Sequence, residues 1–287
     1  MSILIPINHS EILKIYKETD QFTHKGIQGH AMIIGGSYGK IGSISLASKA
    51  CLKTGCGLVT VFIPKCGYTS IQTSNPEVMV LTDEDEEVIS EIHFEIKPQA
   101  VGIGPGLGQS DKSHNALQLF LKTYKIPMVI DADALNIISK FKKLLIHVEP
   151  KTIITPHPKE LQLLIGSWIS EKDKLNKSIS FSKEHQLIIV MKGSPSRVID
   201  GETVYENTTG NAALATAGSG DVLTGMITSL LAQLYSPLHA ALIGVYLHGL
   251  TADIALPETG CQSFIASDII AHIGKAFLSL EKEQKIN

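Results

Sequence analysis

Residues 31–63 read AMIIGGSYGKIGSISLASKACLKTGCGLVTVFI, and this stretch decides the fold class. A strand-like apolar run comes first (31–35), a longer helix-like segment follows (40–55), and a second strand-like run ends it (57–63). Both runs are continuously apolar, as expected for strands of a parallel sheet whose two faces are covered. The stretch therefore predicts a strand–helix–strand unit of a parallel sheet.

The same alternation continues along the chain. Further strand-like runs lie at 78–81, 100–104, 127–131, 151–155 and 187–192, and helix-like segments at 83–95, 110–124, 158–166 and 170–186. The acidic cluster 83–87 begins the first of these segments, where the helix dipole favours negative charge. A hairpin around Asp200-Gly201 (197–200 and 203–205) and three final helices (219–234, 237–256 and 267–281) complete the pattern. We expect an α/β fold with a mostly parallel, doubly wound sheet covered by helices on both faces.

Length and charge narrow the classes of partner. The 287 residues suit one large domain or two small ones, and the net charge is 25 − 28 = −3. Of the 25 cationic residues only Arg197 is an arginine, so phosphate groups must be held by backbone N–H groups and lysines. The absence of a basic surplus argues against nucleic-acid binding.

Cysteine spacing and the termini indicate a cytoplasmic protein. The four cysteines show no zinc-ribbon or CxxC spacing and are expected to be buried free thiols: Cys51, Cys56, Cys66 and Cys261. The N-terminus lacks the basic region of a signal peptide. Residues 222–252 contain no charged side chain, but Ser236-Pro237 interrupts them as an N-cap followed by proline. We therefore expect two core helices there, and no membrane span.

Three glycine-rich segments flank predicted strands. The first (35–40) departs from a Walker A loop at Ile34 and Ile41, and the second (102–108) lacks the last glycine of a dinucleotide fingerprint. The third, AGSGDVLTG at 217–225, opens a long apolar helix. Its small residues let the backbone N–H groups of Gly218, Ser219 and Gly220 converge on an anion at the helix N-terminus.

Asp221 lies in the first turn of that helix. A carboxylate beside an anion-binding loop opposes binding, but it suits a general base that deprotonates a hydroxyl while the loop holds the phosphoryl group. The alternative is a purely structural, helix-capping aspartate.

Other candidate residues follow the predicted strands, where ligands bind in such sheets. Lys192-Gly193 suits a phosphate or an adenine rim, or is a solvated strand end. His157 lies between two prolines that fix its direction, which favours contact with a ligand. Asp131 and Asp133 place two carboxylates at strand spacing, either to contact Mg²⁺ or to cap the next helix through Asp133.

Together these motifs resemble the ADP- or ATP-dependent NAD(P)H-hydrate dehydratases of the ribokinase-like superfamily. The matching segments occur in family order from about residue 22 to residue 255: His24-Lys25-Gly26, Gly104-Pro105-Gly106-Leu107-Gly108, Asp131-Ala132-Asp133-Ala134-Leu135-Asn136, Thr155-Pro156-His157-Pro158-Lys159-Glu160, Thr209-Gly210-Asn211 and 217–225. The Gly-Ser-Gly-Asp element is common to the wider superfamily, whereas the TPHP and DADALN elements narrow the resemblance to this branch.

The resemblance implies a lyase that repairs hydrated NADH and NADPH. ADP would phosphorylate the ring hydroxyl of the S epimer, and elimination of phosphate would restore the dihydropyridine and leave AMP. It implies Asp221 as the catalytic residue and a nucleotide site formed by Lys192, Gly193, Ser194, Pro195, Ser196 and Gly220. The hydrated dinucleotide would contact Ser43, Gly106, His157, Asn211 and Asp221. Ser43 replaces a frequent alanine of the family, and Ser196 stands for its usual threonine.

Further expectations rest on the same resemblance. They are Mg²⁺ as cofactor, ADP rather than ATP as phosphoryl donor, a homotetramer, and a single dehydratase domain over 1–287 with the NAD(P)H-hydrate epimerase on a separate chain. Two alternatives stay open. One is a superfamily kinase acting on a small vitamin-precursor alcohol, and the other is a nucleotide sensor without turnover.

Overall fold

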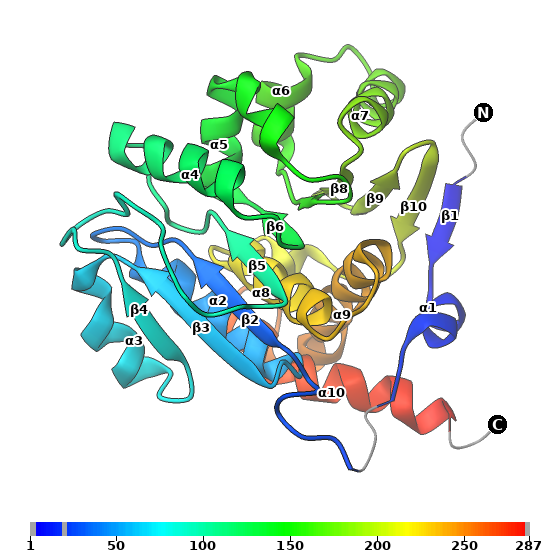
Figure 1. Ribbon diagram of the computed structural model, residues 1–287. Helices are drawn as coiled ribbons and strands as arrows, with labels where there is room; N and C mark the ends of the chain where they lie inside the picture. Colours follow the sequence, from blue (N-terminus) through cyan, green and yellow to red (C-terminus); the bar gives the residue numbers. More distant parts are fainter. Residues whose placement is uncertain (1–3, 19–21, 285–287) are drawn as a thin grey trace.

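The computed structural model describes residues 4–18 and 22–284. Their ten strands form one sheet in the order β1-β10-β9-β8-β7-β6-β5-β2-β3-β4. All neighbouring strands are parallel except at β9, which runs antiparallel to both β8 and β10. The mostly parallel α/β sheet predicted from the sequence is therefore confirmed (Figure 1).

The elements follow one another as strands and helices. The strands are β1 (Leu4–Ile7), β2 (His30–Ile34), β3 (Leu58–Ile63), β4 (Met79–Thr82), β5 (Ala100–Ile103), β6 (Met128–Ile130), β7 (Ile153–Ile154), β8 (Ile188–Met191), β9 (Arg197–Asp200) and β10 (Thr203–Asn207). The α-helices are α1 (His9–Ile15), α2 (Ile41–Lys53), α3 (Tyr68–Ser74), α4 (Asp111–Thr123), α5 (Ala132–Lys140), α6 (Pro158–Ile165), α7 (Glu171–His185), α8 (Ser219–Ala232), α9 (Pro237–Thr259) and α10 (Ala266–Gln284). Short 3₁₀ turns are η1 (Lys65–Gly67), η2 (Lys142–His147) and η3 (Ala212–Leu214).

Helices cover both faces of the sheet, because successive strand residues point to opposite sides. Val129, Ile153 and Val190 pack on the face covered by α2, α8, α9 and α10. Ile130 and Ile154, their neighbours in sequence, pack on the opposite face under α4, α5, α6 and α7 (Figure 1). Each face therefore has its own apolar core.

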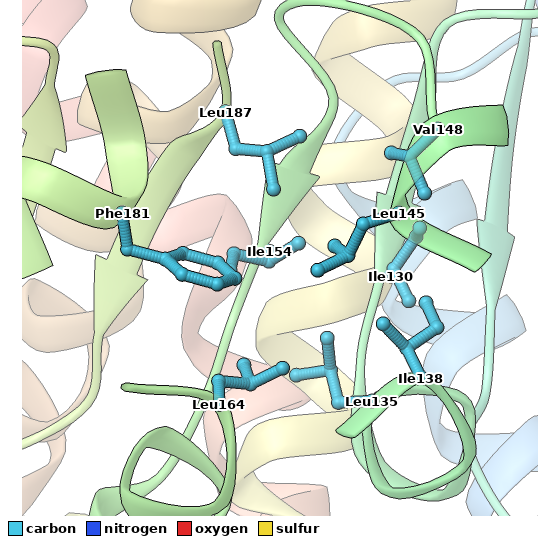
Figure 2. Close-up of a pocket in the computed structure, with 9 residues that line it drawn as sticks. All are labelled: Ile130, Leu135, Ile138, Leu145, Val148, Ile154, Leu164, Phe181 and Leu187. Carbon is cyan, nitrogen blue, oxygen red and sulfur yellow. The ribbon is translucent and has the colours of Figure 1, made fainter. Parts of the chain in front are cut away.

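The second core closes tightly between the sheet and its outer helices. Nine apolar side chains converge there and leave no space for a water molecule (Figure 2): Ile130, Leu135, Ile138, Leu145, Val148, Ile154, Leu164, Phe181 and Leu187. Dense packing of this kind makes the layer a rigid support for the strand ends above it.

The uncharged stretch forms two helices, as expected. Ser236 is the N-cap of α9 and accepts a hydrogen bond from the backbone N–H of His239, with Pro237 in the first turn. Helix α9 is long and apolar enough to cross a membrane by length and composition, but 72% of its most apolar window is buried inside the protein. Its apolar surface is thus used mainly in the core.

The helix predicted at 83–95 is wrong. The carboxylate of Asp83 is buried and accepts hydrogen bonds from the backbone N–H groups of Asp85, Ser90 and Glu91, which holds the segment as a loop. Local side-chain bonds of this kind compete with the helix.

The thiols differ from the prediction that all four are buried. Cys51 and Cys56 are buried and free, whereas Cys66 is partly exposed and Cys261 is exposed. The sequence prediction gave no bounds for the helix after Asp131, which is α5, and it missed the edge strand β1, which extends the sheet beside β10. Strand β1 is only four residues long, which is too short for a clear apolar pattern.

Candidate active site

The carboxyl ends of β6, β7 and β8 bring three polar side chains together. Asp131, Thr155 and Lys192 follow these adjacent strands and continue the side-chain rows of Val129, Ile153 and Val190, which lie on the face covered by α8 and α9. Because the three strands are adjacent in the sheet, these three residues become neighbours although the sequence separates Asp131 from Lys192 by 61 positions. The N-terminus of α8 lies against this edge.

Asp131 is the centre of a buried hydrogen-bond network. Its carboxylate accepts from Lys192 Nζ at 2.7 Å and from the hydroxyl of Thr224 at 2.7 Å, and the residue is 1% exposed. A Cβ added to Gly220 would lie 3.0 Å from Lys192 Nζ. Lys192 therefore has its charge beside the start of α8. Of the three roles that the sequence left open, this position favours contact with phosphate over the adenine rim, and the side chain is too buried for a solvated strand end.

Asp221 lies in the first turn of α8 with a perturbed carboxyl group. Burial raises its pKa to about 6, helped by the negative charge of Asp131, while a hydrogen bond from the Ser43 hydroxyl and the charge of Lys192 act in the opposite direction. A carboxyl group with this pKa is ionised at neutral pH and basic enough to accept a proton. The structure thus gives Asp221 the properties of a general base.

The glycine-rich loop before Asp221 has the geometry of an anion-binding turn. Gly218 adopts φ 84°, ψ −10°, where a side chain would also approach Leu46 and Ala266. Ser219 and Gly220 follow as the first residues of α8, where backbone N–H groups lack a partner within the helix. The Ser219 N–H donates instead to the Thr216 carbonyl oxygen at 3.3 Å, so of these two residues Gly220 has the N–H that is available to an anion. The predicted binding loop is therefore placed directly beside Asp221 and Lys192.

Ser43 and Gly106 form a second wall of the site. Gly106 lies so close to the segment of Ser43 that an added Cβ would stand 2.6 Å from the carbonyl oxygen of Lys40 and 3.4 Å from the Cβ of Ser43. Gly106 has φ 63°, and its carbonyl oxygen accepts a hydrogen bond from Ser37. Ser43 in turn contacts Asp221, so the structure brings these three predicted substrate-site residues together.

His157 serves first as a helix cap. The ring Nδ1 of His157 accepts hydrogen bonds from the backbone N–H groups of Lys159 and Glu160. The backbone N–H of His157 donates to the Glu160 carboxylate at 2.8 Å. Nε2 lies 3.4 Å from Glu160. The side chain is half exposed, so its ring remains accessible, but the nitrogens face its own helix instead of open solvent.

Asp133 does not share a face with Asp131. Ala132 has φ 49°, and this turn separates the two carboxylates. Asp133 accepts from the Gly108 N–H, Gln109 Nε2 and Lys40 Nζ and thereby holds the segment that contains Gly106. The alternative that Asp133 caps α5 is wrong, because no side chain caps this helix.

The remaining predicted residues lie in two loops. Gly193, Ser194 and Pro195 form an exposed turn after β8, and the Ser196 hydroxyl donates to the Gly193 carbonyl oxygen. Asn211 is the N-cap of η3, and its amide donates to the carboxylate of Asp253 on α9. The structure gives no direct contact between either loop and Asp221.

Sequence reasoning missed several polar residues of the site. The Thr155 hydroxyl is fully buried and has no hydrogen-bond partner. Glu160 is buried as well, and burial raises its pKa despite the nearby charge of Lys192. Glu160 stands inside the TPHPKE motif, but only the fold places its carboxyl group near Lys192 and Asp131. Thr224 and His248 carried no signal, since both belong to apolar helices.

The oxygen atoms at these strand ends suit a hard cation that is only partly held by protein. The described residues contain no group of three or more His, Cys, Asp or Glu side chains placed to hold a metal. Mg²⁺ is commonly held by one or two carboxylates together with substrate phosphates and water. Asp131, Glu160 and the unpartnered Thr155 hydroxyl provide such a limited set of oxygen ligands.

Comparisons with known proteins all point to relatives that are named for NAD(P)H-hydrate dehydration or repair. The family described as NAD(P)H-hydrate dehydratase matches residues 31–275. The chain is similar to an ADP-dependent (S)-NAD(P)H-hydrate dehydratase of Bacillus subtilis, with 33% identity over 91% of this chain and 94% of that protein. It is also similar to a bifunctional NAD(P)H-hydrate repair enzyme of Moorella thermoacetica, with 34% identity over 91% of this chain and 51% of the relative. The chain thus spans about half the length of the bifunctional relatives it matches.

A solved structure shares the fold over nearly its full length. It is the crystal structure of ADP/ATP-dependent NAD(P)H-hydrate dehydratase from Bacillus subtilis, co-crystallised with ATP and Mg²⁺. The TM-score is 0.82 at 26% identity, and the match covers 96% of this chain and 98% of that one.

Proposed function

The chain belongs to the NAD(P)H-hydrate dehydratase family and has the ribokinase-like fold. From that premise we propose that it is a hydro-lyase that converts the S epimer of hydrated NADH or NADPH to NADH or NADPH, with ADP as the phosphoryl donor. The observation that carries this proposal is the position of Asp221, a basic carboxylate between an anion-binding helix start and Lys192.

The reaction divides into a transfer and an elimination. Asp221 accepts the proton of the ring hydroxyl as its oxygen forms a bond to the terminal phosphorus of ADP, and the bond from that phosphorus to the bridging oxygen breaks to release AMP. The ring carbon–oxygen bond then breaks with loss of phosphate. Loss of a proton from the adjacent ring carbon restores the double bond. Phosphorylation is needed because hydroxide is a poor leaving group.

The residues around Asp221 stabilise charge in the first step. In this proposal the N–H groups of Gly218 and Gly220 and the ammonium group of Lys192 surround the phosphoryl group, where donors fixed in advance are most effective. Lys192 replaces the arginine clamp that this arginine-poor chain lacks. Asp131 holds the lysine in place through its 2.7 Å contact.

Mg²⁺ fits the oxygen ligands at the strand ends. We place it beside Asp131 and Glu160, with Asp133 left to hold the Gly106 segment. When bound, the ion neutralises negative charge on the nucleotide phosphates.

Two loops complete the binding sites in this proposal. The turn Gly193-Ser194-Pro195-Ser196 contacts the adenine nucleotide, because it continues directly from Lys192. Ser43, Gly106, His157 and Asn211 contact the hydrated dinucleotide. His157 makes this contact with the carbon atoms of its ring, at the edge or on the face, since both ring nitrogens already contact residues of its own helix.

Absorbance at 340 nm tests this function directly. The purified protein is mixed with hydrated NADH, Mg²⁺ and either ADP or ATP. A rise that requires nucleotide supports the dehydratase, and the nucleotide that gives the faster rise is the donor. Nucleotide consumption with a small alcohol but not with the hydrate favours the superfamily kinase, whereas binding without any turnover favours the sensor.

Activity should fall on the acidic side of about pH 6. Asp221 must be ionised to accept a proton, and its pKa is raised to about 6, so kcat/KM for the hydrate should fall about tenfold per pH unit below that value. The Ser43→Ala variant loses a hydrogen bond that favours the ionised form, which should move the midpoint of this fall upward. The nucleotide ionises equally in both proteins, so it does not affect the difference. A midpoint near pH 4, or a downward shift in Ser43→Ala, contradicts the assignment.

The wider organisation is proposed on the same basis. One sheet unites the described residues, which supports a single dehydratase domain over 1–287. We propose an NAD(P)H-hydrate epimerase as its functional partner, because relatives about twice as long as this chain are named bifunctional NAD(P)H-hydrate repair enzymes. We also propose a cytoplasmic homotetramer, for which multi-angle light scattering gives the mass. Because α9 is buried within the chain, α10 with its exposed Leu278 is the better candidate for the interface.

A further inference from the structure

His248 is a buried imidazole that the mechanism described above does not use. It lies on α9, is 8% exposed, and contacts the first residue of α8. Its Nε2 is 3.0 Å from the carbonyl oxygen of Ser219 and 3.2 Å from the Ser219 hydroxyl oxygen. One ring nitrogen thus touches two oxygen atoms of Ser219, the residue that begins α8.

The chemistry of these atoms fixes where the protons lie. A carbonyl oxygen can only accept a hydrogen bond, so Nε2 must carry the hydrogen. Burial lowers the pKa of His248 to about 4, so the ring is neutral at pH 7 and carries only that one N–H. With its hydrogen on Nε2, this nitrogen has no free lone pair, and the Ser219 hydroxyl cannot donate to it.

The hydroxyl proton of Ser219 is therefore free for another acceptor. The described residues offer no acceptor within hydrogen-bonding distance of this hydroxyl, although Ser219 is almost fully buried. Ser219 directly precedes Gly220 and Asp221 in the first turn of α8, and Gly220 lies against Lys192, so the residue adjoins the proposed phosphoryl site.

We propose that His248 is a positioning residue that, through its Nε2–H, holds Ser219 so that the Ser219 hydroxyl donates a hydrogen bond to the phosphoryl oxygen during transfer. The inference rests on the proposed function and adds a side-chain donor to the backbone N–H groups of the loop. His248 acts through Ser219, and Ser219 touches the reacting group.

A double-mutant cycle tests this chain of contacts. Loss of one donor to a developing oxyanion costs about 10²–10³ in rate at well-studied sites. Because the backbone donors remain here, Ser219→Ala should lower kcat by about 10–100-fold with a smaller change in the KM for nucleotide. His248→Leu should have a similar effect. The double variant should be no slower than the slower single variant, within about threefold. If His248→Leu lowers kcat by the same factor in the wild-type protein and in the Ser219→Ala variant, the two residues act independently and the inference is overturned.

Two conservative variants separate positioning from packing. Gln can place an N–H donor where Nε2 lies, so His248→Gln should recover most of the lost turnover. Asn carries the same donor on a shorter side chain, so His248→Asn should resemble His248→Leu. Equal activity of the Gln and Asn variants argues against the hydrogen bond as the cause.

The tautomer can be read without any turnover. Long-range ¹H–¹⁵N correlation spectra of the wild-type protein should show His248 with its proton on Nε2 and no titration above pH 5. A proton on Nδ1 overturns the inference even if one of the variants fails to fold. Absence of nucleotide-dependent dehydration in the wild type refutes the proposed function instead. The spectra and the 340 nm assay therefore distinguish failure of the His248 inference from failure of the proposed function.

Discussion

Replacing Asp221 by asparagine should reduce turnover by at least about 10³-fold, a barrier increase of about 4 kcal/mol. Asparagine has nearly the same shape but cannot accept the proton of the ring hydroxyl. Nucleotide binding should persist, because Gly218, Ser219 and Lys192 are unchanged. Stability should be kept as well, since the substitution removes a partly buried carboxylate that Asp131 repels. The rate of the 340 nm rise and calorimetric binding of ADP check these outcomes together.

Asp200→Asn provides the matched control for this experiment. Asp200 ends β9, and its carboxylate pairs with Lys151 at 2.7 Å, outside the active site. An ion pair of this kind contributes little to stability, so the control should retain full activity. Activity of Asp221→Asn within about tenfold of the wild type, or about 1.4 kcal/mol, shows that the catalytic assignment is wrong.

Replacing Gly225 by alanine should destabilise the protein by about 3 kcal/mol or more, or prevent folding. Gly225 lies in α8 where this helix crosses α2, and an added Cβ would stand 2.0 Å from the carbonyl oxygen of Ala47. The obstacle is backbone, so the two helices must separate. Because α8 also carries Ser219 and Asp221, activity should fall with stability. Urea unfolding gives the free energy of unfolding for comparison.

Gly274→Ala is the opposite case within the same protein. Gly274 lies in helix α10, and an added Cβ would meet no atom within 4 Å. Alanine favours the helix over glycine by about 1 kcal/mol, so this variant should be unchanged or more stable. If Gly225→Ala unfolds at the wild-type urea concentration, the tight crossing of α2 and α8 is not required.

Local patterns in the sequence were sufficient for most of the sheet and for the principal catalytic candidate. Continuous apolar runs predicted the parallel strands, and Asp200-Gly201 predicted the hairpin of β9 and β10. Asp221 was recognisable because glycines precede it and an apolar helix follows. Failures occurred where side chains determine the backbone. The Asp83 carboxylate accepts hydrogen bonds from the backbone N–H groups of Ser90 and Glu91, which folds the segment into a loop. Its acidic composition suggests a helix start and does not reveal these bonds.

The sequence by itself determined most of the strands, the start of α8 and the position of Asp221 in its first turn, because each of these depends on residues that are adjacent in the chain. Tertiary structure alone decided what surrounds that carboxylate. Asp131 and Lys192 are 61 positions apart, yet the strand order brings them within 2.7 Å, and this contact places a cation beside the loop. The pKa of Asp221 and the tautomer of His248 likewise follow from burial and from partners on other elements. Local sequence patterns give neither the order of the strands nor which polar groups are buried together, and both arise only when the sheet is assembled.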